Sequence, residues 1–550
     1  MTATQLDPFA THEVLNQAQP LAGHDVFGTD VALVEAVERE GAPWASAELH
    51  DLGRQAGDPE WQERGRLANQ NPPVLVSHDR YGHRIDAVRY HPAYHELMAQ
   101  SVAHGLHAAP WVDGRPGAHV ARAAKVITWY QVDGGHICPI SMTYSVVPAL
   151  RNNQALASLW EPRLTSRDYD PDDRPSTEKT GATCGMGMTE KQGGSDVRAN
   201  TTAARPAGEG AFALSGHKWF CSAPMSDAFL MLAQAPGGLS CFLVPRWLPD
   251  GTRNRFRIER LKDKLGDKSN ASSEIELLDT TGFLVGEEGR GVRTIVEMVN
   301  HTRLDCTLGS AAIMRQGTAQ AAWHAVHRSA FGGPLAEKPL MANVLADLAL
   351  ESEAATAAAL RLARSFDADL SDEHEQHLKR LITPIVKYWT CKRAPQHAAE
   401  ALECLGGNGY VEDFDLARLF RQSPLNGVWE GSGNVICLDV LRALARAPEA
   451  LDAYWDEVAL AGGTDARLDE AVASLKGDLA DLDDLEMRAR RLVERMALVF
   501  QASLLVRSAP AAVADAFVTS RVAGDSGRAF GTLPTGLDLP AIVDRARPQL

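Results

Sequence analysis

The sequence predicts a mostly helical α+β protein in which a β-rich section separates two helical regions. Apolar residues recur at helical spacing near the start of the chain, as at Val31, Val34 and Val37. They alternate with polar residues in the middle, and helical spacing then returns. These changes of pattern predict four domains, at residues 1–180, 181–290, 291–447 and 448–550.

The first two sections differ in the period of their apolar residues. Residues 1–180 are expected to form a helical domain, with a break at the prolines that begin at Pro72. Residues 181–290 alternate apolar and polar side chains, most clearly at Phe256 and Ile258. Such alternation is typical of half-buried strands, so this section is expected to be β.

The last two sections are expected to be helical. Ile295, Met298 and Val299 follow the helical period and begin a bundle that ends near Pro448. Residues 448–550 continue with short apolar repeats and predict an additional helical extension.

The composition favours a folded protein without disulfides or metal. Its 550 residues exceed what one core usually holds, and 45% of them are hydrophobic. The eight cysteines include no Cys-x-x-Cys pair, which predicts reduced thiols. Two histidine pairs at i, i+3 lack a third ligand nearby, so no metal site is expected.

No targeting or membrane segment is expected. The first residues, MTATQLDPFATHEV, lack a basic region followed by an apolar stretch, and no apolar run approaches the ~18 residues that span a bilayer. We therefore expect a cytoplasmic protein with no membrane attachment. Its net charge of −16 repels polyanions on average, so nucleic-acid binding would need a locally basic face.

Two distant tracts together suggest a flavin site. Residues 187–196 (GMTEKQGGSD) offer hydroxyls and a glycine turn whose backbone N–H groups can bind a carbonyl or a pyrophosphate. Residues 428–434 (VWEGSGN) offer a carboxylate between glycines. An ordinary β-turn has the same composition as the first tract, and a carboxylate at a helix start can simply interact with the helix dipole.

These tracts resemble the acyl-CoA dehydrogenase superfamily, which carries a Thr-Glu-x-x-x-Gly-Ser-Asp turn and an aromatic-Glu-Gly-Thr/Ser segment. Three more motifs match in the right order: 216–222 (GHKWFCS), 328–334 (RSAFGGP) and 405–410 (LGGNGY). The resemblance covers nearly the whole chain. It implies an N-terminal helical domain, a β-barrel, a four-helix bundle and FAD as cofactor.

The resemblance also implies the residues that hold FAD. The turn and the neighbouring strand would contact the flavin, the Arg-x-x-Phe element would reach a neighbouring subunit's FAD, and the glycine loop would hold its diphosphate. A complete site would then need an assembly, and a homotetramer is expected. The implied cofactor residues are Met188, Thr189, Gly194, Ser195, Phe220, Ser222, Arg328, Phe331, Gly406, Gly407, Gly409, Ser432 and Asn434.

Glu430 is the residue implied as the catalytic base. In the family this position removes the α-proton of an acyl-CoA while a hydride passes to the flavin, and Arg303 matches the active-site arginine. A carboxylate does this work well in a dry pocket that raises its pKa. The family's usual Pro and Tyr are replaced by Lys191 and Trp429, which changes the shape expected of the acyl pocket.

The tail suggests a second partner. Several strings, including MTEKQGGSDV and WEGSGN, resemble a branch of the superfamily that responds to alkylation damage and binds duplex DNA. Arginine is a good phosphate ligand, and three arginines fall along one stripe of an expected helix. The candidate DNA-binding residues are Arg442, Arg488, Arg491, Arg495 and Arg521. A charged stripe can equally be a solvated helix face.

The resemblance therefore predicts a DNA-binding FAD flavoprotein of the alkylation response with weak acyl-CoA dehydrogenase activity. One alternative is a metabolic acyl-CoA dehydrogenase that acts on a short or branched acyl-CoA and has no role with DNA. Another is the very-long-chain type, whose extension attaches to membranes, but the charged interruptions of the tail disfavour it.

Overall fold

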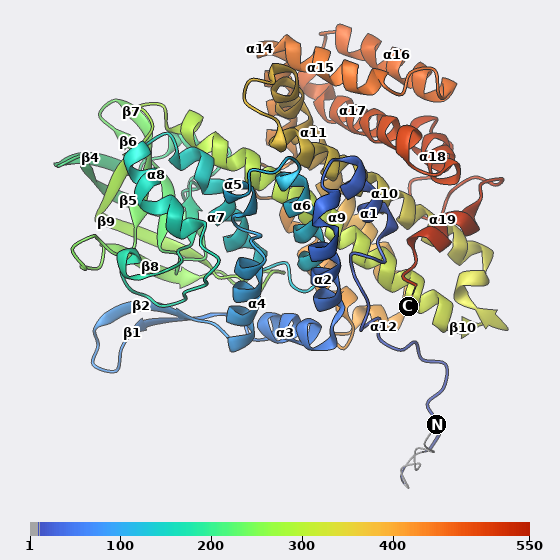
Figure 1. Cartoon of the computed structure of the whole chain (residues 1–550), viewed down its shortest axis with the longest axis horizontal. Helices are drawn as coiled ribbons and strands as arrows, with labels where there is room; N and C mark the ends of the chain where they lie inside the picture. Colours follow the sequence, from blue (N-terminus) through green and yellow to red (C-terminus); the bar gives the residue numbers. More distant parts are fainter. Residues whose placement is uncertain (1–8, 10, 550) are drawn as a thin grey trace.

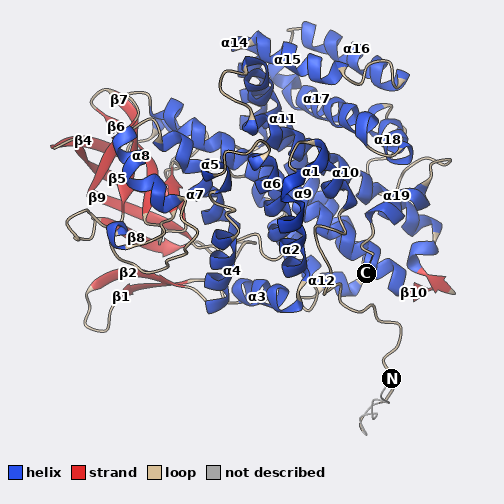
Figure 2. Ribbon diagram, in the orientation of Figure 1, coloured by secondary structure: helices blue, strands red, loops and turns tan. Residues whose placement is uncertain are grey.

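The computed structural model describes residue 9 and residues 11–549. A β-sheet occupies one end of the long axis, and helices form the rest of the molecule (Figure 1). The C-terminal helices α15–α18 lie together along one side of the helical part (Figure 2). The predicted fold class, mostly helical α+β with a central β section and an added C-terminal region, is confirmed.

The N-terminal region is mainly helical. Asp58 caps one helix by accepting the N–H of Glu60, and Pro59 fits the first turn because its missing N–H would be unpaired there. The helices are α1 (Val31–Arg39), η1 (Pro43–Ala45), α2 (Ser46–Gly57), α3 (Pro59–Gln70), α4 (Pro92–Ala103), α5 (Ala109–Val112), α6 (Ala118–Tyr130), α7 (Ile137–Leu150), α8 (Gln154–Leu164) and η2 (Ser176–Glu178).

A β-hairpin interrupts these helices and was not predicted from the sequence. Strands β1 (Val74–His78) and β2 (Arg84–Arg89) pair antiparallel. The hairpin is fixed by a distant strand, because Asp86 accepts the N–H of Ile258 at 3.2 Å. A contact across 172 residues leaves no local signal, which explains why helical spacing alone did not reveal it.

The middle of the chain forms a mixed sheet that closes on itself. Strands pair in the order β6-β4-β5-β9-β7, and β7 pairs again with β6, so these five strands form a small barrel. Strand β3 adds to β6, and β8 adds to β9. The elements are β3 (Cys184–Gly187), η3 (Val197–Ala199), β4 (Ala203–Gly208), β5 (Ala211–Ser222), β6 (Ala228–Ala235), β7 (Gly238–Pro245), β8 (Phe256–Leu261) and β9 (Ser272–Val285).

Three long helices follow the sheet. They pack on one another, and α14 packs against α11. The elements of this region are α9 (Gly291–His327), β10 (Ser329–Ala330), β11 (Gly333–Pro334), η4 (Leu335–Glu337), α10 (Pro339–Asp367), α11 (Glu373–Cys404), α12 (Gly407–Tyr410), α13 (Asp415–Gln422), η5 (Leu425–Gly427) and α14 (Gly433–Arg446).

The C-terminal extension packs against these helices. Helix α17 contacts α10, α11, α14 and α16, and α19 contacts α10, so the extension shares one hydrophobic core with the bundle. Its elements are α15 (Pro448–Ala459), α16 (Ala466–Ala480), α17 (Leu485–Ser508), α18 (Ala511–Phe517), η6 (Val518–Val522) and α19 (Leu539–Ala546).

Two chain-wide features accompany this fold. Each helix that the structure describes is too short or too polar to cross a membrane. All eight cysteines are buried free thiols.

Candidate functional site

The turn at residues 187–196 is anchored by a buried ion pair. Glu190 is fully buried and accepts a 2.8 Å hydrogen bond from Nζ of Lys218 on β5. Burial alone would raise the pKa of Glu190, but Lys218 and the donors of Thr201 and Thr202 lower it to about 2. The turn is therefore fixed to the sheet by the carboxylate of Glu190, which remains ionised.

The rest of the turn faces outwards. Gly194 and Ser195 are exposed, and a Cβ at Gly194 would lie 2.4 Å from Oγ1 of Thr189. Glycine is therefore required where the turn folds over the Thr189 hydroxyl. The carbonyl of Thr189 accepts the N–H of Trp219 at 2.8 Å, which ties the turn to β5.

Strand β5 presents the other two predicted flavin residues beside this turn. Phe220 is 52% exposed, Ser222 is half-buried, and Cys221 between them is fully buried. Residues two apart on a strand share a face, so Phe220 and Ser222 lie on the side that points away from the barrel interior.

The Glu430 segment is a non-helical loop between η5 and α14. Glu430 has a positive φ of 57°, which is unusual for a residue with a side chain. Nζ of Lys387 donates to the carbonyls of Trp429 at 3.0 Å and of Gly431 at 2.6 Å. Nε of Arg303 donates to the carbonyl of Glu430 at 3.1 Å. Cations from α11 and α9 thus hold the strained loop on both sides.

Arg303 is itself held by Asp439. Its Nη1 donates to Oδ2 of Asp439 at 2.7 Å, and Arg380 donates to the other oxygen at 2.8 Å. Both arginines together keep the pKa of Asp439 low despite its burial. Arg303 therefore contacts the backbone of Glu430 rather than its carboxylate.

One carboxylate oxygen of Glu430 is left without a partner. Its Oε2 atom is buried and has no hydrogen-bond partner among the described residues. Burial raises the pKa of Glu430, and the Thr302 hydroxyl and the charges of Arg303 and Lys387 offset only part of this shift. A buried carboxylate oxygen without a hydrogen-bond partner is costly in a fold, and a carboxyl group with a raised pKa suits proton exchange.

The two tracts border one hydrophobic cluster. Met188 from the turn and Trp429 from the loop both pack against a cluster that includes Cys138 and Met142. The turn and the base segment therefore each place one residue against the same buried hydrophobic cluster.

The Arg-x-x-Phe element lies elsewhere. Arg328 follows α9, and the short hairpin β10–β11 carries Phe331, which is 95% exposed at φ 51°. Figure 1 shows β10 at the opposite end of the molecule from the sheet. One chain alone cannot place Arg328 beside its own residues 187–196.

The glycine loop divides into an open part and a packed part. A Cβ at Gly406 or Gly407 would meet no atom within 4 Å, so their backbone is accessible. A Cβ at Gly409 would lie 2.1 Å from the carbonyl oxygen of Leu402, and the N–H of Gly409 already bonds to Gly406. Gly409 is therefore required for close packing against α11, and its N–H is already used within the loop. Ser432 and Asn434 are exposed at the start of α14.

Three of the five candidate DNA-binding arginines are engaged within the protein. Arg521 is 11% exposed and pairs with Asp347 and Glu351 of α10. Its assignment to DNA is wrong, because its charge is already neutralised inside the fold.

Arg488 and Arg495 also turn inwards from α17. Arg488 pairs with Asp481 at 3.4 Å and donates to nearby carbonyls, and Arg495 pairs with Asp478. The expected basic stripe is therefore broken. Arg442 and Arg491 are exposed and have no ion pair within the described part of the chain.

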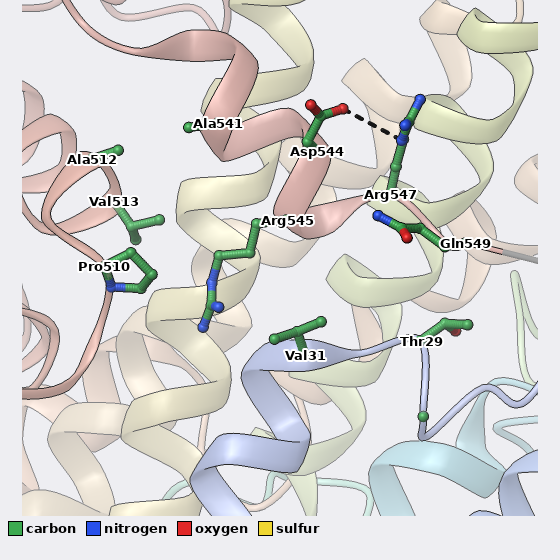
Figure 3. Close-up of a pocket in the computed structure, with 11 residues that line it drawn as sticks. Thr29, Val31, Pro510, Ala512, Val513, Ala541, Asp544, Arg545, Arg547 and Gln549 are labelled. Atoms are coloured by element: carbon green, nitrogen blue, oxygen red, sulfur yellow. Dashed lines mark ion pairs between the residues drawn. The ribbon is translucent and has the colours of Figure 1, made fainter.

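A separate pocket of about 410 Å³ lies between the two ends of the chain (Figure 3). It is bordered by the start of α1 and by α18 and α19, and Asp544 pairs with Arg547 on its rim at 3.4 Å. None of the predicted flavin or base residues lines it.

The sequence did not indicate Lys387, Asp439 or Lys218, which fix the functional segments. Lys218 lies inside the GHKWF string, and Lys387 lies in an otherwise apolar stretch of α11. A lysine among apolar residues is the signal in the sequence that could have marked Lys218 and Lys387.

Three successive regions of the chain match known protein families. Residues 16–171 match the N-terminal domain of adaptive response protein AidB, residues 185–280 the middle domain of acyl-CoA dehydrogenases, and residues 289–445 their C-terminal domain. AidB of Escherichia coli (strain K12) is 49% identical over 471 residues, which cover 85% of this chain and 87% of that protein.

A relative from Caenorhabditis elegans is similar in both sequence and structure. Acyl-CoA dehydrogenase family member 11 of Caenorhabditis elegans is 31% identical over 78% of this chain and 72% of its own length. The crystal structure of Caenorhabditis elegans ACDH-11 in complex with C11-CoA has a TM-score of 0.84, 26% identity and 93% coverage of both chains.

The fold and these similarities define an oxidoreductase of the acyl-CoA dehydrogenase class. The chain belongs to the acyl-CoA dehydrogenase family and carries the AidB-type N-terminal domain.

Proposed function

We propose that the protein binds FAD and acyl-CoA at the apolar surface shared by residues 187–196 and the Glu430 loop, with Glu430 as the base. The observation that carries this proposal is the buried, unpartnered Oε2 of Glu430 on a loop clamped by Lys387 and Arg303. The carboxylate would take the proton from the carbon next to the thioester. The raised pKa brings its proton affinity closer to that of a neutral-pH base.

The residues present suit a flavin. The exposed turn at Gly194 and Ser195 leaves backbone N–H groups free for an acceptor, and Phe220 offers an exposed apolar ring beside it. FAD, when bound, would supply the acceptor for the hydride that leaves the β-carbon. A Bacillus anthracis acyl-CoA dehydrogenase with this fold, at 20% identity and TM-score 0.61, was solved with FAD, and ACDH-11 was solved with C11-CoA.

We infer a homotetramer from the family resemblance, and the predicted FAD contacts support an assembly of at least two subunits because they lie at opposite ends of one molecule. Strand β10, which directly follows Arg328 and precedes Phe331, lies at the far end of the molecule, while β5 lies in the sheet (Figure 1). If both contact the same FAD, they must come from different subunits. The 95% exposure of Phe331 supports an interface there, since an isolated chain would leave this ring in water.

The experiment that tests the flavin proposal uses the purified full-length protein. We expect it to show a flavin spectrum that bleaches anaerobically when a short-chain acyl-CoA is added. Protein that takes up no FAD on reconstitution would contradict the proposal.

Duplex DNA is the second partner we propose, within the alkylation response, and weak acyl-CoA turnover would accompany it. The support is the 49% identity to AidB together with exposed arginines on α14 and α17, of which Arg442 and Arg491 have no ion-pair partner among the described residues. Arg446 lies four residues after Arg442, on the same face of α14. An assembly that gathers such side chains could bind phosphates despite a subunit charge of −16.

The DNA proposal is tested with Arg442→Gln/Arg491→Gln. We expect weaker binding to unrelated duplexes alike and a salt slope reduced by about two, because each lost phosphate contact removes ~0.9 from that slope. The control Arg89→Gln/Arg198→Gln changes the net charge equally at exposed sites in β2 and η3, which lie outside α14 and α17. Wild type that turns over acyl-CoA efficiently but binds no duplex at low salt would favour the metabolic dehydrogenase instead.

A further inference from the structure

A segment near the N-terminus is hydrogen-bonded to the loop that carries Arg328. Asn16 donates from Nδ2 to the carbonyl of Ser329 at 2.8 Å and accepts the N–H of Ser329 at Oδ1, also at 2.8 Å. The backbone carbonyl of Asn16 accepts a hydrogen bond from Nη1 of Arg328. Three contacts thus join residues more than 300 positions apart.

The side-chain amide of Asn16 makes the two backbone hydrogen bonds to Ser329 that a neighbouring strand would otherwise make. A neighbouring β-residue would offer one donor and one acceptor to Ser329, and the amide of Asn16 offers both. Asn16 has a φ of 56°, a conformation that asparagine adopts more readily than most residues. Further along the segment, the carbonyl of Gln19 accepts Nε1 of Trp323 at 2.8 Å.

The loop it holds has little stability of its own. Strands β10 and β11 contain two residues each, and a hairpin of that size is marginal in water. Between them Phe331 stands exposed, and its carbonyl accepts a hydrogen bond from Nζ of Lys338 at 3.1 Å. The direction of Arg328 and Phe331 therefore depends on contacts from outside the hairpin.

The contact with Asn16 leaves the charge of Arg328 available. Its partner is a neutral carbonyl, and Arg328 has no carboxylate partner within the part of the chain that the structure describes. A guanidinium that is directed but not neutralised can still bind a diphosphate.

We propose that Asn16 is a positioning residue that directs Arg328 and Phe331 towards the FAD of a neighbouring subunit. This inference rests on the proposed function, in which the Arg328 loop completes a flavin site across an interface. Asn16 itself does not touch FAD. It acts by fixing the backbone at Ser329 and one nitrogen of Arg328.

The test measures FAD dissociation from the full-length protein by the rise in flavin fluorescence on dilution. Asn16→Ala should weaken FAD binding about three- to tenfold, since each lost hydrogen bond contributes ~0.5–1.5 kcal/mol and ~1.4 kcal/mol is tenfold. Asn16→Gly keeps the backbone free to adopt positive φ and should weaken binding equally. Gln19→Ala is the matched control, because Gln19 contributes only its backbone carbonyl.

A double-variant cycle separates positioning from general stability. If Asn16 acts through the Arg328 loop, Asn16→Ala should weaken FAD binding less in the Arg328→Ala background than in wild type. Equal FAD affinity of Asn16→Ala and wild type, or an undiminished effect in the Arg328→Ala background, would overturn the inference. Wild type that binds no FAD would instead contradict the proposed function.

Discussion

Two charged residues with buried polar atoms, Glu430 and Arg521, show how partners distinguish a functional group from a structural one. Glu430 keeps one carboxylate oxygen buried without a partner, whereas Arg521 lies between Asp347 and Glu351. A buried charge with partners belongs to the fold, and removing one member leaves the others uncompensated. A buried carboxyl without a fixed partner is available for proton exchange.

Arg521 should therefore matter for stability and not for DNA. Arg521→Gln removes a cation from two buried carboxylates, a change that typically destabilises by ~3–5 kcal/mol. We expect a clear fall in Tm by calorimetry, with FAD content at low temperature unchanged. Arg442→Gln, at an exposed site, should leave Tm nearly as in wild type. An unchanged Tm with weaker DNA binding would restore the DNA role of Arg521.

The environment of Glu430 also predicts a pH dependence. Burial raises its pKa above the ordinary value of 4.5, and only the ionised carboxylate can accept a proton. The rate of flavin bleaching by acyl-CoA should therefore rise with pH through a pKa above 4.5, while FAD binding stays flat over this range. A bleaching rate that is independent of pH would mean that another group removes the proton.

At the scale of elements, the Glu430 loop depends on the helices beneath it. The loop has no regular structure, and Lys387 of α11 and Arg303 of α9 bond to its carbonyls. Lys387 is 1% exposed and is directed at two of these carbonyls, so it sets where the base points.

Removing that anchor should slow the chemistry without releasing FAD. Lys387→Met deletes two charge-assisted hydrogen bonds, each worth ~1.5–3 kcal/mol, and we expect bleaching to slow by about 10–100-fold. Lys392→Met, five residues on in the same helix, is the control. A bleaching rate equal to wild type in Lys387→Met would show that the loop holds its shape without this lysine.

How much of the structure could be predicted from the sequence differs from element to element. Alternation correctly placed Phe256 and Ile258 on the buried face of β8, and helical spacing correctly placed Ile295 and Met298 in α9. The β1–β2 hairpin was missed and the ion pairs of Arg521 were not foreseen, because their partners lie far away in sequence: Arg521 meets Asp347 across 174 residues. Spacing reveals local periodicity and not distant partners.

At the scale of the whole molecule, the flavin proposal requires residues from both ends of the folded molecule. The turn and β5 lie at the sheet, Arg328 projects at the other end, and the Glu430 loop approaches the cluster beside the turn. The motifs identified these segments from sequence, but only the fold shows that they cannot all meet within one copy. A functional unit of at least two subunits follows from this arrangement.

The most direct measurement of the central claim is an anaerobic acyl-CoA titration of wild type and Glu430→Gln, followed by the flavin spectrum. We expect both proteins to hold FAD equally, because Glu430 offers no predicted cofactor contact. Wild type should bleach, and the variant should bleach ~10²–10⁴-fold more slowly, the usual effect of losing a general base. Equal bleaching of the two proteins would contradict the account.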